Sequence, residues 1–330
     1  MLTKQNWLVS VALVVMMMVF LAVSSQAVAS EKVVMKCVTA FSKDTPELSG
    51  FWMFTDKVEK KLGAKIKIEY LGGNEVIPAF SLFEMLGKGA VDVAAIPANY
   101  AKPYLPIADT LHLTRLTPWK ERENGAYDIW RNAFRKALKI EFLGHVTTNY
   151  PFQLYTNFEV KQLSDFAGKA FRSAPVTVPF LKALKAGPVS MPPGEIYSAL
   201  ERKVVMGYNW PTLGMLELGL AEVTKYRIDP GFYPVDVCVY FNSATWNKLP
   251  RDVRSEIENI MKDLEKDIHN YYAKKIIEDT EKQKKAGLTI LQLPDGVAKE
   301  YLKIAYEAGW KEVLTAAPEE GAKVKALIDR

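Results

Sequence analysis

The feature of this sequence that most constrains its fold is a weak internal repeat of a helix followed by a strand. Residues 83–92 (FEMLGKGAVD) have a counterpart in residues 197–206 (YSALERKVVM), and Pro97 and Pro211 follow at the same distance. Two such units, each ending in a loop, indicate two α/β domains of one architecture. Ligands of open α/β sheets lie beyond the carboxyl ends of strands, so these loops would line a cleft. Coincidence between common α/β patterns is the alternative, because short apolar runs are ambiguous.

Strand and helix patterns also alternate before the first of these units. The β-branched run over 33–39 predicts a strand, and the polar loop over 41–48 is of the kind that binds ligands. Alternating elements favour a mostly parallel sheet covered by helices. The expected elements are a helix over 51–62, a strand over 66–70, a turn at 72–74, a helix over 78–86 and a strand over 91–96.

The C-terminal third carries a long amphipathic pattern in a segment dense with lysine and glutamate. Its polar face is expected to be solvated, and its apolar face to pack across both domains. A partner-binding or dimerising helix is the alternative, which the pattern favours less. The apolar positions are Ile257, Ile260, Met261, Leu264, Ile268, Tyr272, Ile276 and Ile277.

The N-terminus has the pattern of a signal peptide. Lys4 precedes an apolar run over 7–23, and Ala27-Val28-Ala29 gives a small-x-small cleavage site after Ala29. A retained membrane anchor is the alternative, but the run falls slightly short of the roughly 18 residues that a span requires. Export to the periplasm follows from this prediction, and no later segment has the length and apolar character of a span.

The length of 330 residues exceeds what one hydrophobic core usually serves, which favours two domains. A hydrophobic content of 49% with 25% charged residues is typical of folded globular chains. The predicted division is a signal peptide over 1–29, domain I over 30–150, domain II over 151–245 and a C-terminal helical region over 246–330 that packs on both domains.

Charge, cysteine and histidine usage exclude several functions. The formal charge of +5 becomes +4 when the leader with Lys4 is removed, and this mild excess does not indicate a nucleic-acid partner. Cys37 and Cys238 lie in apolar runs that read as buried strands, so free thiols are favoured over a disulfide. No metal or cofactor is expected, because the three histidines lack ligand-like spacing to the cysteines: they are His112, His145 and His269.

Three stretches in the second half of the chain carry a resemblance to a known family. They are 163–175 (LSDFAGKAFRSAP), 191–200 (MPPGEIYSAL) and 241–250 (FNSATWNKLP). In order and spacing they resemble the DctP-type solute-binding subunits of TRAP (tripartite ATP-independent periplasmic) transporters, over nearly the whole mature chain. The resemblance implies a periplasmic-binding-protein-like α/β fold with a ligand cleft between two domains and a long helix across both. It also implies capture of a small organic carboxylate, without catalysis, and its delivery to the TRAP membrane permease.

The resemblance assigns a role to Arg172. In the family, the arginine of this strand holds the ligand carboxylate through two parallel hydrogen bonds, a task that suits a planar guanidinium better than a lysine. Without the family, Arg172 reads equally well as a surface residue or as part of a structural ion pair.

Departures from the family pattern narrow the expected ligand. Trp210 stands where many members have asparagine, Phe152 where some members have a second arginine, and Pro97 where some have an acidic residue. These changes favour a drier pocket and a monocarboxylate with an apolar or aromatic body over a dicarboxylate or sugar acid. The alternative is that the aromatic side chains belong to the core. The further candidate ligand-binding residues are Asn149, Asn209 and Tyr233.

Two other classes of function remain open. An exported enzyme acting on an organic acid is one, although the sequence contains no G-x-S-x-G, H-E-x-x-H, phosphate loop or G-x-G-x-x-G. One arginine surrounded by aromatic residues grips a ligand and does not activate it. The other is a binding protein that presents its ligand to a membrane receptor.

Overall fold

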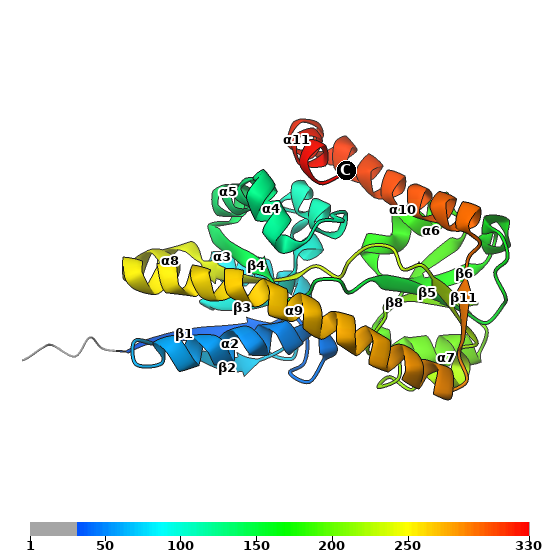
Figure 1. The fold of residues 1–330 in the computed structure, drawn as a ribbon, viewed down its shortest axis with the longest axis horizontal. Helices are drawn as coiled ribbons and strands as arrows, with labels where there is room; N and C mark the ends of the chain where they lie inside the picture. The colour runs from blue at the N-terminus through cyan, green and yellow to red at the C-terminus, as the bar shows by residue number, and fades with distance from the viewer. Residues whose placement is uncertain (1–31, 330) are drawn as a thin grey trace, which may run out of the picture. The chain divides into compact units, whose positions relative to one another are not determined.

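The computed structural model describes residues 32–329, and from Val34 onward the chain forms one compact unit. The strands of this unit form two sheets, one of five strands and one of six (Figure 1). The predicted signal peptide lies outside the described residues. None of the helices within 32–329 combines the length and apolar character that crossing a bilayer requires.

The five-stranded sheet is buried on both faces. Its central strands read as continuous apolar runs, as expected for strands covered by helices on both sides. Helix α2 (Ser49–Leu62) contributes Phe51 and Phe54 to the core on one face, and α3 (Leu82–Gly87) and α5 (Ala126–Leu138) contribute Phe83 and Phe134 to the core on the other. In spatial order the strands are β2 (Ile66–Gly72), β1 (Val33–Thr39), β3 (Val93–Pro97), β10 (Val237–Asn242) and β4 (Ile140–His145).

The six-stranded sheet carries the second helix-to-strand unit. Helix α7 (Ile196–Glu201) leads into β8 as α3 leads into β3, and Pro97 and Pro211 are the last residues of their strands. The predicted pair of units is therefore confirmed. In spatial order the strands are β11 (Thr289–Gln292), β9 (Tyr226–Asp229), β5 (Phe152–Thr156), β8 (Gly207–Pro211), β6 (Ala170–Ser173) and β7 (Gly187–Ser190).

Both sheets are mixed, which corrects the prediction of a mostly parallel sheet. In the first sheet β1 and β3 are parallel, but β10 pairs antiparallel with both β3 and β4. In the second sheet β6 is parallel to β7 and β8, whereas β5 is antiparallel to β8 and β9. The apolar pattern of a segment shows that a strand is buried, but it does not show whether the neighbouring strand runs parallel or antiparallel to it. Domain limits stay a prediction, and β10 joins the first sheet although its residues fall within the predicted range 151–245.

The two cysteines cannot meet, because they lie on opposite faces of one sheet. Cys37 of β1 packs in the core that contains α2, Cys238 of β10 packs in the core that contains α3, and β3 runs between the two strands. Both are buried free thiols, as predicted.

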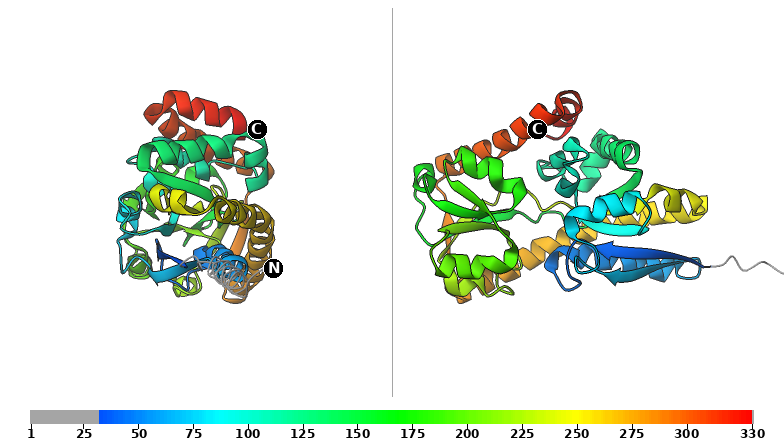
Figure 2. Two further views of the ribbon diagram at one scale, coloured as in Figure 1. Left: turned by 90° about the vertical axis from the view of Figure 1, so that its left-hand side faces the viewer. Right: turned by 180° about the vertical axis from the view of Figure 1, so that it is seen from behind.

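The long helix α9 (Arg251–Lys285) runs alongside both sheets (Figures 1 and 2). Its 35 residues correspond to about 52 Å of helix. Its first half packs against α2 and β4, and near its end Gln283 Nε2 donates to Thr212 O, 2.7 Å away, in the loop after β8. The predicted packing across both halves is confirmed, except that Ile277 is 68% exposed.

Helix α10 (Asp295–Ala316) makes a second connection between the halves. It packs on α6 (Val178–Ala183) beside the six-stranded sheet and on the 3₁₀ segment η4 (Pro106–His112). Helix α11 (Pro318–Ile328) follows it and packs on α5.

Candidate functional site

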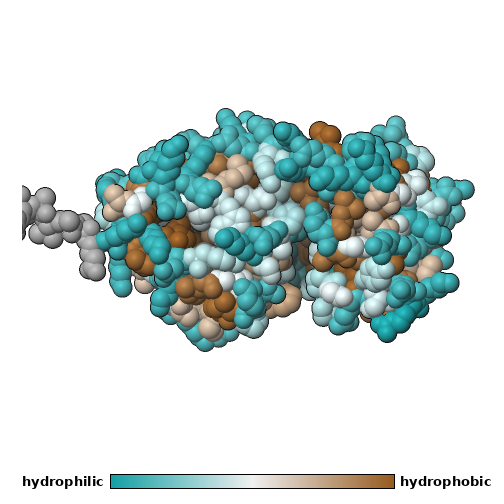
Figure 3. Space-filling view, turned by 90° about the horizontal axis from the view of Figure 1, so that it is seen from below, coloured by the Kyte–Doolittle hydropathy of each residue, from teal (hydrophilic) through white to brown (hydrophobic). Residues whose placement is uncertain are grey.

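A cavity of about 110 Å³ lies where strands of both sheets end. Phe41 follows β1, Pro97 ends β3, Arg172 lies near the end of β6, and Trp210 lies near the end of β8. This is the position in which open α/β sheets bind ligands. Figure 3 views the molecule from the side of α2 and α7, and this face is hollowed near its middle.

Arg172 is the only cationic side chain among the described residues that line this cavity. It is 5% exposed, and its guanidinium donates to two backbone carbonyls, from Nε to Met191 O at 3.1 Å and from Nη1 to Asn209 O at 3.3 Å. Its Nη2 makes no hydrogen bond within residues 32–329, and no carboxylate there forms an ion pair with it. Burial lowers the pKa of Arg172 to about 10, so the group stays protonated at neutral pH. The cavity thus presents a buried cation without a counter-ion.

Two more unpaired donors come from β8. The buried Asn209 accepts a hydrogen bond from Ala174 N at its Oδ1 (2.8 Å), while its Nδ2 has no partner within the described chain. The same holds for the buried Nε1 of Trp210, whose ring lies 5.6 Å from the Arg172 guanidinium carbon. Because an unpaired buried donor costs about 1–3 kcal/mol, this cavity favours a ligand with acceptor oxygens.

Four of the six predicted site residues line this cavity: Arg172, Trp210, Asn209 and Phe152. Phe152 is half-buried, opposite Pro211 in the ladder between β5 and β8, with its ring 6.4 Å from that of Phe232. Their part in binding remains a prediction. Pro97 also lines the cavity, and its apolar ring cannot form an ion pair with a ligand.

Tyr233 and Asn149 do not line this cavity. Tyr233 is fully buried, its hydroxyl donates to Ala305 O of α10, and its ring packs 4.8 Å from that of His112. Asn149, with φ of 54°, lies on a second cavity. Sequence order places both beside pocket residues but does not show to which side of the chain a side chain points.

We expect Tyr233→Phe to leave ligand affinity unchanged and to lower the free energy of unfolding by about 1 kcal/mol, the usual net value of one hydrogen bond. Calorimetric titration and chemical denaturation measure the two quantities. A marked loss of affinity with unchanged stability would contradict this structural role.

Two buried acidic residues that were not among the predicted site residues also line the cavity, Glu47 and Asp236. Tyr150 Oη donates to Glu47 Oε1 (3.2 Å), and Asn99 donates to both oxygens of Asp236, from its backbone N at 2.9 Å and from Nδ2 at 3.0 Å. Burial raises the pKa of each carboxyl group to about 7. The cavity therefore contains more ionisable groups than the predicted apolar pocket with one cation. The polar loop over 41–48 was the only signal that pointed to Glu47.

Glu47 should make the stability of the ligand-free protein depend on pH. Its pKa is about 7 in the folded state against an ordinary 4.5, so the folded state holds this proton more tightly. Stability therefore falls as pH rises from about 4.5 to 7, by about 3 kcal/mol in total. We expect Glu47→Gln to raise the free energy of unfolding by about 2–3 kcal/mol at pH 8 and by little at pH 5. Urea denaturation at both pH values measures the free energy of unfolding of the variant and the wild type. An equal gain at about pH 5 and about pH 8 would contradict the prediction.

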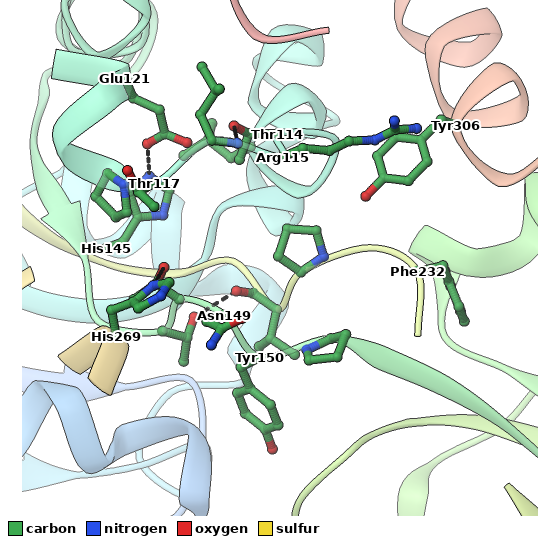
Figure 4. Close-up of a pocket in the computed structure, with 18 residues that line it drawn as sticks. Thr114, Arg115, Thr117, Glu121, His145, Asn149, Tyr150, Phe232, His269 and Tyr306 are labelled. Atoms are coloured by element: carbon green, nitrogen blue, oxygen red, sulfur yellow. Dashed lines mark hydrogen bonds and ion pairs between the residues drawn. The ribbon is translucent and has the colours of Figure 1, made fainter. Parts of the chain in front are cut away.

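A second cavity, of about 270 Å³, lies beside the chain segment that leaves β4 (Figure 4). The Glu121 carboxylate lies 2.9 Å from His145 Nε2, and the Arg115 guanidinium carbon lies 3.9 Å from the centre of the Tyr306 ring. Val235 lines both cavities, so they adjoin the same stretch of chain.

In space, Cys238 lies beside His145 and His145 lies beside Glu121, an arrangement that a nucleophile, a base and an orienting carboxylate would have. Cys238 Sγ lies 3.6 Å from His145 Nδ1, but Cys238 is fully buried and lines neither cavity. Burial raises the pKa of its thiol, so it is not a thiolate at neutral pH. Burial lowers the pKa of His145, but Cys238 and Glu121 beside it oppose this effect and hold the pKa above its ordinary value. His145 and Glu121 therefore form a structural ion pair beside the buried thiol of Cys238.

Comparison with known proteins agrees with the fold. The sequence model of the bacterial extracellular solute-binding protein family 7 matches residues 37–314. The C4-dicarboxylate-binding periplasmic protein DctP of Rhodobacter capsulatus is 27% identical over 313 residues, 92% of this chain and 90% of that protein.

Two solved solute-binding proteins share the fold at low identity. The Desulfovibrio salexigens protein with bound orotic acid has a TM-score of 0.77 at 17% identity, covering 90% of this chain and 98% of its own. The Bordetella pertussis receptor DctP7, described as binding pyroglutamic acid, has a TM-score of 0.76 at 16% identity, covering 90% and 100%. The chain therefore belongs to the family 7 bacterial extracellular solute-binding proteins, the periplasmic solute-binding subunits of TRAP transporters that its sequence resembles.

Proposed function

We propose that this protein captures a small monocarboxylate with an apolar or aromatic body and delivers it to the TRAP membrane permease. The observation that carries the proposal is Arg172, a buried guanidinium in the cavity without an acidic partner in the described chain. Carboxylate binding by an arginine fork supplies the missing charge and two hydrogen bonds.

The other charges in the cavity favour one ligand carboxylate over two. Apart from Arg172, the ionisable side chains that line it are Glu47, Asp236 and Tyr100, none of which offers a cation. A second carboxylate in the same cavity would meet like charge in a poorly solvated space, which is unfavourable by several kcal/mol. Trp210 and Phe152 supply the apolar walls.

The named ligands of the related proteins span more than one class. The Rhodobacter relative is named for C4-dicarboxylates, whereas orotic acid and pyroglutamic acid each carry one carboxyl group on a ring. The choice of a monocarboxylate therefore rests on the charges of this cavity and not on the relatives.

Capture requires the cavity to open and close. Its lining residues come from both sheets, and the chain passes between the sheets near Val235. We expect the ligand to enter an open form, to be taken by Arg172 and to favour closure by hinge bending. The ligand drives closure only to the extent that it binds the closed form better than the open form. No chemical change of the ligand is part of this cycle.

A thermal-shift screen of the purified protein against mono-, di- and aromatic carboxylates tests the proposal. A ligand at about 100 times its dissociation constant stabilises the fold by roughly 2.7 kcal/mol, which is easily detected. Stabilisation by monocarboxylates, with the ligand recovered unchanged, is the expected result. A response confined to dicarboxylates or sugar acids would overturn the ligand class, and no response to any acid would overturn carboxylate binding.

A further inference from the structure

The cavity holds a buried cation and a buried carboxyl group that do not pair with each other. Arg172 projects from β6 of the six-stranded sheet, and Glu47 lies in the short 3₁₀ segment η1 (Pro46–Leu48) that precedes α2. No ion pair within 4.0 Å joins them, and no lysine or arginine within residues 32–329 pairs with Glu47. Tyr100 also lines the cavity and lies within electrostatic range of both groups.

Glu47 and Asp236 differ in their capacity to accept more hydrogen bonds. Asp236 uses one oxygen for the backbone N–H of Asn99 and the other for its side-chain amide. Both oxygens of Asp236 are therefore used to hold Asn99 in the 3₁₀ segment η3 (Ala98–Ala101). Glu47 accepts from the Tyr150 hydroxyl and from its own backbone N–H, and no further side chain of residues 32–329 donates to it. A carboxylate has about four acceptor positions, so Glu47 keeps capacity for a donor in the cavity.

An unpaired buried charge is costly, and the ionised form of Glu47 adds a second one to Arg172 at this cavity. A simple monocarboxylate would neutralise Arg172 and leave Glu47 as it is. A ligand with both a carboxylate and a protonated nitrogen would neutralise both, and its two charges would leave the total charge of the cavity unchanged.

We propose that the ligand is a small zwitterion, an amino or imino acid, whose carboxylate binds Arg172 and whose protonated nitrogen donates to Glu47. This inference rests on the proposed function and defines the ligand class of the same site. It also assigns Glu47 as a specificity-determining residue. Apolar parts of the ligand then lie against Trp210 and Phe152.

Calorimetric titration with matched probes tests the inference. L-proline is compared with cyclopentanecarboxylate, and 4-aminobutanoate with pentanoate, pairs in which carbon replaces the nitrogen. The compound 4-hydroxybutanoate supplies a neutral donor in place of the ammonium group. We expect the nitrogen-containing member of at least one pair to bind about tenfold or more tightly than its carbon analogue. In Glu47→Gln this preference falls to about threefold or less, while the exposed Glu59→Gln on α2 keeps it.

The outcomes separate this inference from the proposed function. If the carbon analogues or 4-hydroxybutanoate bind as tightly as the ammonium compounds, the zwitterion inference is wrong and carboxylate binding stands. A preference for nitrogen that survives Glu47→Gln would remove Glu47 from the site. If no probe binds at millimolar concentration, the zwitterion inference falls, and the wider carboxylate screen decides whether the proposed function falls with it.

Discussion

Arg172→Ala is expected to weaken carboxylate binding by at least about 100-fold, the largest effect of any single substitution in the cavity. The guanidinium is buried, has no carboxylate partner in the described chain and keeps Nη2 free of hydrogen bonds there. Its removal leaves the ligand carboxylate in a poorly solvated cavity without a cation, which costs about 2–5 kcal/mol. Calorimetric titration with the best acid from the screen measures the loss.

Two further variants show whether the fork or only the charge matters. Arg172→Lys keeps a positive charge but loses the planar pair of donors, so we expect an intermediate affinity about tenfold below that of the wild type. Arg202→Ala removes an exposed arginine after α7 and should leave affinity within about twofold of the wild type. Wild-type affinity in Arg172→Ala would show that the ligand binds elsewhere.

The largest expected loss of stability comes from Arg122→Met. Arg122 of α4 (Pro118–Asn124) holds the buried Glu265 of α9 through three hydrogen bonds: Nη2 to Oε1 at 2.6 Å, Nε to Oε2 at 2.9 Å and Nε to Oε1 at 3.2 Å. It also donates to Leu143 O. Burial raises the pKa of Glu265, and Arg122 is the main group that opposes this effect. Without Arg122 the carboxylate stays buried and unpaired, so we expect the free energy of unfolding to fall by about 3–5 kcal/mol.

An exposed ion pair on the same helix gives the matched control. Lys57 of α2 reaches Asp267 of α9 at 2.7 Å, with side chains 41% and 55% exposed, so Lys57→Met should cost less than about 1 kcal/mol. The double variant Arg122→Met/Glu265→Leu removes both buried charges and should recover much of the loss. Urea denaturation compares the variants, and equal losses for Lys57→Met and Arg122→Met would refute the role of burial.

The sequence predicted the local elements of the fold well, because apolar spacing follows the local geometry of helix and strand. The strand at 33–39, the helix at the end of the loop over 41–48 and the long α9 all lie where their patterns placed them. The position of β10 was not predictable in this way. Its apolar run shows burial on both faces, but its insertion between β3 and β4 depends on residues more than ninety positions away.

The candidate site was predicted in part, for a similar reason. The family resemblance located Arg172, and the departures from the family pattern located Trp210 and Phe152, all of which line the cavity. Glu47 and Asp236 were missed because nothing in the surrounding sequence distinguishes a buried carboxylate from the many exposed ones. Burial of a charged side chain results from tertiary packing and leaves no periodic signal.

The unpaired charges of the cavity affect how this protein should be engineered. Replacing Glu47 or Arg172 with a neutral residue relieves a desolvation cost in the empty protein, so directed evolution for heat resistance without ligand will enrich such replacements. The selected clones would survive heating and would bind solute less well. Selection in the presence of ligand favours the opposite outcome at Arg172, because a bound carboxylate would stabilise the variants that keep this cation more than those that lose it.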